Sequence, residues 1–357
     1  MGAGLLYHLA EEGCTDVLLI EKGELTSGST WHAAGQCPSL VGNYNLAKIH
    51  AYSNDLYPRL EEMTGQYVSW HASGGIRLAR EKVDLEWFSY LHGISKSVGF
   101  DMEIIGPSEI SQLVPSMDLS GVIAGAYTTS DGHADPSGLT NAMARGAINM
   151  GAKIERHNRV IDINLLESGE WEVVTEKGTV VAEIVVNAAG CFARQISQMV
   201  GSDMPLVNME HHYVVTGNVR EFVAGDTELP VIRDPHSSSY IRQEQKSGLI
   251  GIYEGEQMTE AWAPKGYPAW DSDSELFPDD LERLMPWLGR AMECLPILED
   301  AGIKRIVNGA IPHPPDGPPY LGPVAGIKNF WLCCGSSFGI AQGAGCGKYL
   351  APWMLHG

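Results

Sequence analysis

A helix followed by a short apolar strand that ends in an acid is the feature that most constrains the fold of this chain. Residues 2–13 have the apolar spacing of an amphipathic helix, with Gly13 at its C-terminal end. Residues 16–22 form a nearly continuous apolar run, which is typical of a buried parallel strand. Near its end, Glu21 suits hydrogen bonds from ribose hydroxyls. This order predicts the second half of a βαβ unit in a dinucleotide-binding domain.

Small hydroxyl residues after this acid favour a flavin over a nicotinamide. Ser27, Ser29 and Thr30 come where side chains and backbone amides can meet a pyrophosphate, and His32 follows them. The run Ser-Gly-Ser-Thr-Trp-His-Ala-Ala-Gly resembles that of the dimethylglycine and sarcosine dehydrogenases, flavoproteins of the wider D-amino-acid-oxidase-like group. The resemblance implies that His32 carries FAD covalently. The chemistry of such a link is available, since a neutral imidazole nitrogen is nucleophilic. The alternative is that His32 only caps or lines the clamp.

The first residues match only part of the dinucleotide fingerprint. That motif needs a preceding strand and two earlier glycines, whereas here only its last glycine is present, best matched by Gly2. We therefore expect the first strand to lie upstream and the chain to be a fragment. The alternative is an incomplete site that holds FAD weakly.

Length and composition allow two domains. The chain has 357 residues and 44% hydrophobic content, enough for a sizeable core. The predicted class is α/β, with a Rossmann-like FAD-binding domain that lacks its first strand and is interleaved with a mixed or antiparallel-sheet substrate domain. The FAD-binding domain is expected to comprise residues 1–65, 129–205 and 309–357, and the substrate domain residues 66–128 and 206–308.

Charge and cysteine content narrow the partners and the compartment. The formal net charge of −20 argues against nucleic-acid or anionic-membrane binding, and no apolar run is long enough to span a bilayer. Seven cysteines without a C-x-x-C pair are expected to be reduced thiols, and no spacing typical of metal ligands is present. These features favour the bacterial cytoplasm or the mitochondrial matrix.

Turn residues and β-branched runs predict the remaining elements. A helix is expected over residues 137–150 and another from the Gly-rich stretch 335–347 towards Trp353, whereas 310–323 is expected to be irregular and the acidic stretch 271–280 a solvated lead into a helix. Strands are predicted at 151–156, 159–163, 171–175, 179–187 and 329–333, and, as an antiparallel substrate roof, at 67–70, 75–78, 212–216, 239–242 and 248–253.

Later segments complete the expected flavin site. Asn187-Ala-Ala-Gly190 resembles the second FAD-contact motif of the family, and the glycine-rich entry to the last helix suits a cofactor edge, with close helix packing as the alternative. The resemblance implies FAD contacts at Gly2, Glu21, Lys22, Ser27, Ser29, Thr30, His32, Ala34, Gly35, Val160, Ala189, Gly190, Gly317, Ser337, Phe338, Gly339 and Ile340.

The resemblance also implies a catalytic pair, His211 and Tyr240, that takes up a proton from a substrate ammonium. A two-residue period puts His211 and Tyr213 on one face of their strand and His212 on the other. The alternative is that the pair is merely polar and lies on a half-buried sheet. Arg77 and Arg242 are the candidates for contact with a substrate carboxylate, and the alternative for each is a structural or surface arginine.

The implied activity is FAD-dependent oxidative N-demethylation of dimethylglycine or sarcosine, with hydride transfer to flavin N5 and release of formaldehyde from an iminium. Electrons are expected to pass to an electron-transfer flavoprotein or to oxygen, and folate to bind only if a C-terminal folate domain exists. Cys191-Phe192 departs from the family, where a tryptophan is often found. The alternatives are an amine oxidase with another substrate and a non-catalytic relative such as the regulatory subunit of pyruvate dehydrogenase phosphatase.

Overall fold

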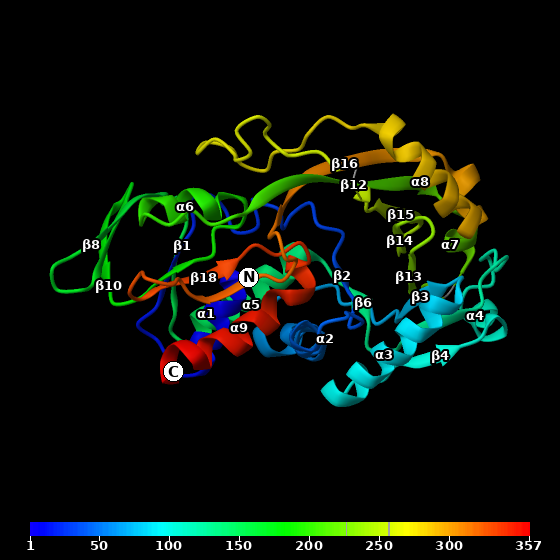
Figure 1. Ribbon diagram of the computed structural model, residues 1–357, viewed down its shortest axis with the longest axis horizontal. Coiled ribbons are helices and arrows are strands. Elements are labelled where there is room, and N and C mark those ends of the chain that lie inside the picture. The colour runs from blue at the N-terminus through cyan, green and yellow to red at the C-terminus, as the bar shows by residue number, and fades with distance from the viewer. Residues whose placement is uncertain (226, 256–257) are drawn as a thin grey trace.

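The computed structural model of the protein describes residues 1–225, 227–255 and 258–357. Two parts lie side by side along its longest axis (Figure 1). One part contains both termini, a layer of helices and several small sheets, and the other is a roof built on an eight-stranded sheet. Two long strands, β12 (Val207–Asn218) and β16 (Ile303–His313), lead from one part into the other. The predicted α/β class is confirmed.

Two helices of the first part are capped by a side chain at their N-terminus. Asp135 accepts hydrogen bonds from the backbone N–H groups of Ser137 and Gly138, and Asn43 accepts one from Leu46. These caps fix where two helices begin. The helices that pack together in this part are α1 (Gly2–Glu11), α2 (Tyr44–Thr64), α5 (Pro136–Asn149) and α9 (Gly339–His356).

Glycines let α9 pack directly against the backbones of α1 and α2. A Cβ built on Gly4 would lie 2.2 Å from the carbonyl oxygen of Gly343, and one on Gly345 would lie 2.1 Å from that of Ile49. Any larger residue would push these helices apart. The glycines inside α9 therefore serve close helix packing, which was the alternative interpretation of this stretch.

Within the described residues, two three-stranded sheets and two two-stranded ladders complete the first part. Parallel pairs join β1 to β7 and β11 to β18, and these two ladders are not hydrogen-bonded to each other within the described residues. The strands are β1 (Leu18–Ile20) with β7 (Lys153–Glu155); β10 (Gly178–Ala182), β9 (Trp171–Thr175) and β8 (Val160–Leu165); β11 (Val185–Asn187), β18 (Phe330–Cys334) and β17 (Tyr320–Pro323); and β2 (Gln36–Cys37) with β6 (Gly132–His133).

The roof is one mixed sheet in the order β16-β12-β15-β14-β13-β3-β5-β4. Its inner strands contribute Ile232, Ile241 and Ile250 to the largest apolar core, against Leu284 and Leu288 of a covering helix. The pair β13–β3 is parallel, so the roof is not purely antiparallel. The other strands of the roof are β3 (Gly75–Ala79), β4 (Glu103–Ile105), β5 (Ala124–Thr128), β13 (Val231–Asp234), β14 (Ser239–Glu244) and β15 (Ser247–Ile252). The remaining α-helices of the described chain are α3 (Lys82–Val98), α4 (Pro107–Leu113), α6 (Ala193–Met199), α7 (Arg220–Ala224) and α8 (Leu281–Cys294).

Three predicted segments differ from the structure. The strand predicted at 179–187 is broken into β10 and β11, which belong to different sheets. Residues 67–70 form no strand, because Ser69 has a φ of 48° in the left-handed region. The stretch 310–323 is not wholly irregular, since β16 runs to His313 and β17 begins at Tyr320. No helix of the described chain is both long and apolar enough to cross a membrane.

Candidate active site

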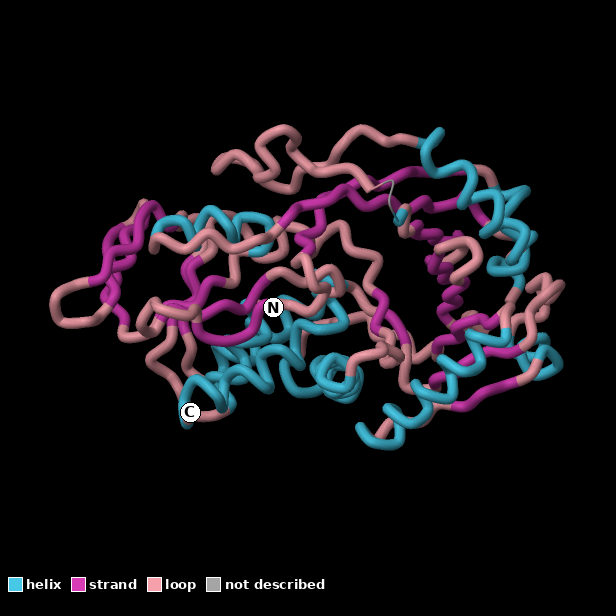
Figure 2. The backbone as a smooth tube through the Cα atoms, in the orientation of Figure 1, coloured by secondary structure: helices cyan, strands magenta, loops and turns pink. Residues whose placement is uncertain are grey.

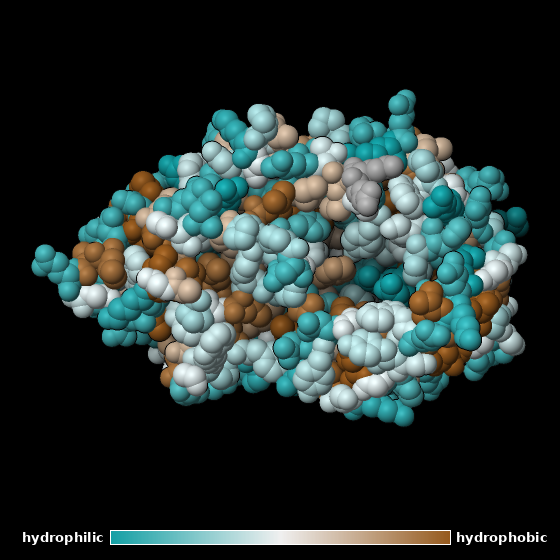
Figure 3. All heavy atoms as spheres, in the orientation of Figure 1, coloured by the Kyte–Doolittle hydropathy of each residue, from teal (hydrophilic) through white to brown (hydrophobic). Residues whose placement is uncertain are grey.

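A cavity of about 1150 Å³ lies between the two parts, where the surface is hollowed near the middle of Figure 3. It is lined by His211 and Tyr240 and by every predicted FAD contact except Gly317. Gly317 does not line the cavity: β16 continues to His313, and Gly317 lies in the turn that follows, where its N–H donates to the carbonyl of Pro314. Residues near both ends of the chain, such as Gly2 and Ile340, thus share one cavity.

Two helices begin at this cavity without a side-chain cap. Gly2 at the start of α1 and Gly339 at the start of α9 both line it, and among the described residues neither helix has a side chain that accepts from its first N–H groups. Free N–H groups and the positive end of the helix dipole bind anions. These two ends suit the diphosphate and the electron-rich edge of a reduced flavin, so the residues present fit FAD.

The acid after β1 is held at the wall of the cavity. Glu21 accepts a hydrogen bond from the backbone N–H of Gly23 at 2.9 Å. Burial raises its pKa, and the negative charge of Asp273 adds to the effect. Its second oxygen can accept from ribose hydroxyls, as the sequence predicts.

His32 lies deep in the cavity against a glycine of the roof. Its side chain is only 6% exposed, and burial lowers its pKa to about 4, so the ring is neutral at neutral pH. A Cβ built on Gly309 of β16 would lie 2.3 Å from Cε1 and 2.5 Å from Nδ1 of His32. Gly309 is not among the site residues predicted from the sequence. The one sequence signal for a close approach at this position is a glycine in the interior of a strand.

His211 and Tyr240 face the same cavity from β12 and β14, the two strands that flank β15 in the roof. Nε2 of His211 lies 2.9 Å from the hydroxyl of Tyr240. Burial, together with the nearby His313, His212 and His32, lowers the pKa of His211 to about 3, and burial raises that of Tyr240 well above its usual range. Both groups are therefore neutral over the physiological pH range.

A glycine and a second tyrosine fix this pair. A Cβ on Gly251 would lie 1.8 Å from Cζ of Tyr240, so the tyrosine ring lies across the bare backbone of β15. The ring of Tyr253 is 5.0 Å from that of His211 and also lines the cavity. On the opposite face of β12, as the two-residue period predicts, His212 is fully buried and contacts Glu254 at 3.0 Å.

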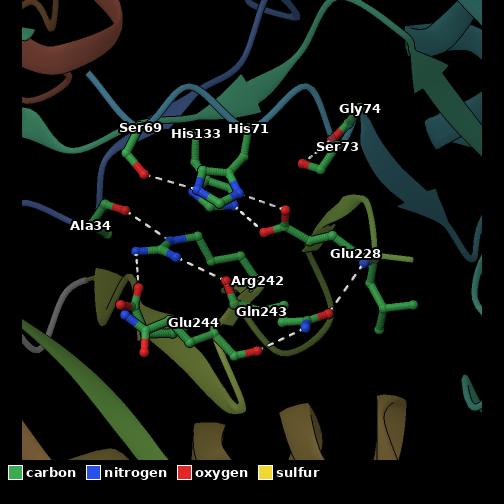
Figure 4. Close-up of polar contacts among 12 residues, drawn as sticks. Ala34, Ser69, His71, Ser73, Gly74, His133, Glu228, Arg242, Gln243 and Glu244 are labelled. Carbon is green, nitrogen blue, oxygen red and sulfur yellow. Dashed lines mark hydrogen bonds and ion pairs between the residues drawn. The ribbon is translucent and has the colours of Figure 1, made fainter. Parts of the chain in front are cut away.

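Arg233 of β13 lines the roof side of the cavity. The two arginines predicted from the sequence for a substrate carboxylate, Arg77 and Arg242, do not line it. Arg242 is occupied elsewhere: it donates to the carbonyl of Ala34 at 2.9 Å and pairs with Glu244 at 2.6 Å (Figure 4). Arg233 donates to Gln36 at 3.1 Å, while its buried Nε has no partner within the described structure. Arg233 escaped prediction because its neighbours in β13 gave no sign of the cavity.

Figure 4 also shows a trio that sequence spacing does not reveal. Nδ1 of His71 and Nε2 of His133 lie 2.7 and 2.6 Å from the two carboxylate oxygens of Glu228. The two rings are stacked 4.5 Å apart with an interplanar angle of 12°. The lone pair of an imidazole nitrogen lies in the plane of its ring, so two nearly parallel rings do not direct their lone pairs at one metal ion. The trio is therefore two histidine rings hydrogen-bonded to one carboxylate.

The comparison with protein families decides the class. The family described as FAD dependent oxidoreductase matches residues 1–353. The chain belongs to this family. The predicted family and FAD as its cofactor are thereby confirmed. Human mitochondrial dimethylglycine dehydrogenase is 41% identical over 360 residues, which span 100% of this chain and 42% of that protein.

Two further proteins that resemble this chain are also named as dehydrogenases. Human mitochondrial sarcosine dehydrogenase is 32% identical over 369 residues, covering 100% of this chain and 39% of that protein. The chain thus spans about two fifths of the length of these curated relatives. The crystal structure of L-proline dehydrogenase from P. horikoshii has a TM-score of 0.84 at 25% identity and covers 99% of this chain and 90% of that one.

Proposed function

We propose that this oxidoreductase carries out oxidative N-demethylation of an N-methyl amino acid, with dimethylglycine or sarcosine as substrate. The observation that carries the proposal is that His32, the neutral His211–Tyr240 pair and Arg233 line one cavity. FAD, when bound, supplies a hydride acceptor. The relatives named above act as dehydrogenases of these two amino acids, which supports the choice.

The roof residues prepare the amine. Only an unprotonated amine has the lone pair that stabilises the cation left by hydride loss. Because burial disfavours charged forms, an ammonium that enters gives up its proton. The hydrogen-bonded His211 and Tyr240, 2.9 Å apart, provide a relay that passes this proton on towards bulk water and returns to its neutral state. Arg233 offers a partner for the carboxylate, which orients the N-methyl group. The iminium then hydrolyses to formaldehyde.

We further propose that His32 carries the FAD covalently. A neutral ring nitrogen is the nucleophilic form, and the lowered pKa of His32 keeps it so. An electron-transfer flavoprotein or oxygen would take the electrons, in the mitochondrial matrix or a bacterial cytoplasm. Folate would serve only through a further domain.

A substrate panel tests the activity and the role of Arg233 together. With an artificial electron acceptor, we expect formaldehyde from dimethylglycine and sarcosine but none from glycine betaine, whose quaternary nitrogen has no lone pair. Arg233→Ala should raise KM for dimethylglycine about 10- to 100-fold, the worth of a charge-assisted hydrogen bond. Its effect on N,N-dimethylethylamine, which has no carboxylate, should be small.

The matched control is Arg59→Ala, which removes an exposed arginine paired only with Asp55 of its own helix. This variant should behave as the wild type with every amine. Equal loss of both amines in Arg233→Ala would show that Arg233 does not bind the carboxylate. A protein that holds flavin and oxidises no amine would favour the non-catalytic alternative.

A further inference from the structure

A loop of the roof reaches back over the dinucleotide part. Residues 262–277, here called the strap, lie in the long loop between β15 and α8, which Figure 2 shows extending beyond the roof strands. Near its two ends the strap is tied to the long strands: Nδ2 of Asn208 donates to the carbonyl of Gly266 at 3.1 Å, and the N–H of Phe277 donates to that of Asn308 at 2.8 Å. Between these ties it can contact the other part of the molecule.

An aromatic contact joins the middle of the strap to that part. The ring of Trp270 stacks on Phe192 with centroids 5.5 Å apart and an interplanar angle of 19°. The guanidinium of Arg159 lies 5.9 Å from the centre of the Trp270 ring, and Nζ of Lys22 lies 4.8 Å from that of Phe192. Trp270 is thus the aromatic anchor of the strap.

One side-chain and one backbone hydrogen bond join the strap to the segment that follows β1. Nζ of Lys22 donates to the carbonyl of Ser272 at 2.5 Å, and the N–H of Ser274 donates to the carbonyl of Ser27 at 3.0 Å. Lys22 and Ser27 flank the turn after Glu21, where the adenosine and diphosphate of FAD are expected. The strap therefore crosses the cavity at its dinucleotide end.

The strap is also part of the cavity wall. Six of its residues line the same cavity as His32: Trp262, Trp270, Ser272, Asp273, Ser274 and Glu275. Asp273 lies close enough to Glu21 for the two negative charges to oppose each other. The strap is thus held by the contacts of Trp270 and Lys22, and the like charges of Asp273 and Glu21 oppose them.

We propose that the strap is a cofactor-binding element that closes over the adenosine diphosphate half of FAD and must open for the dinucleotide to enter or leave. The proposal deepens the proposed function, since it rests on the placement of that half beside Glu21. It assigns Trp270 the role of retaining the cofactor. The acidic stretch 271–280, expected to be a solvated lead into a helix, therefore has two roles. Its first half lines the cavity, and Asp280 at its end caps α8.

The first test measures release of FAD from protein in which His32→Ala removes the expected covalent link. Adding Trp270→Ala should speed release about tenfold, as expected for loss of one aromatic contact. The control is Tyr267→Ala, which removes an exposed aromatic of the same strap that does not line the cavity. Equal release rates in the two double variants would overturn the role of Trp270.

The second test locks the strap. In otherwise unchanged protein, Ser27→Cys with Ser274→Cys places two thiols where the backbones are already hydrogen-bonded. We expect the oxidised apoprotein to take up FAD at least tenfold more slowly than the same protein after reduction, monitored by flavin fluorescence. Equal uptake by cross-linked and reduced protein would sink the strap proposal. Acid-stable flavin in His32→Ala would refute only the covalent link, and the uptake measurement would still decide on the strap.

Discussion

Replacing Tyr240 with phenylalanine or His211 with alanine should lower the rate of substrate oxidation about 10²- to 10⁴-fold, the usual worth of a positioned proton-transfer group. The two side chains are 2.9 Å apart, and each is the other's hydrogen-bond partner in the cavity. Loss of either leaves the other without a partner in a buried site. Rapid mixing of dimethylglycine with flavin-loaded protein would measure the loss directly as slower bleaching.

The lowered pKa of His211 also sets the expected pH dependence of the rate. The pKa of His211 lies at about 3, below its ordinary value, so its protonated form gains population only as the pH falls towards that value. We therefore expect no loss of rate from His211 protonation between about pH 7 and pH 5. Tyr213→Phe, which changes a neighbouring tyrosine on the same strand, is the control. Rates in His211→Ala and Tyr240→Phe that equal those of this control would refute the catalytic pair.

Adding one methyl group at Gly309 should disrupt covalent flavin attachment. A Cβ there would lie 2.3 Å from the His32 ring, so the ring must move, and Gly309→Ala displaces the proposed nucleophile without changing its chemistry. A displacement of about 1 Å at a reacting group typically costs about 100-fold in rate. We expect the rate at which acid-stable flavin forms to fall by about that factor, while loosely bound FAD is retained.

The matched control for this variant is Gly289→Ala in α8, where an added Cβ has nothing within 4 Å. It should attach flavin at the wild-type rate. If Gly309→Ala attached flavin as fast as Gly289→Ala, the ring of His32 could not be held where the structure has it.

Local sequence was sufficient for much of the dinucleotide part. The amphipathic spacing of residues 2–13 predicted α1, and the apolar run ending at Glu21 predicted β1, because both patterns depend only on neighbouring residues. The two-residue period around His211 also predicted which side chains face the cavity. The proposed FAD contacts came from a motif, and all but Gly317 line the cavity.

The remainder depends on contacts between distant residues. Arg233 lines the cavity and Arg242 does not, yet both lie on neighbouring strands with similar surroundings in sequence. Gly309 and Gly251 matter because of the rings that lie against them, which no local pattern records. In the same way, the acidic stretch around Asp273 looked solvated, and its contact with Lys22 and Ser27 depends on the long strands that carry it there.

The most direct test of the account is to denature the FAD-loaded protein in acid and ask whether flavin absorbance stays with the polypeptide. The account predicts a yellow precipitate from the wild type and a colourless one from His32→Ala, with the released flavin in the supernatant. A colourless precipitate from wild-type protein that had bound FAD would contradict the assignment of His32 as the covalent attachment site.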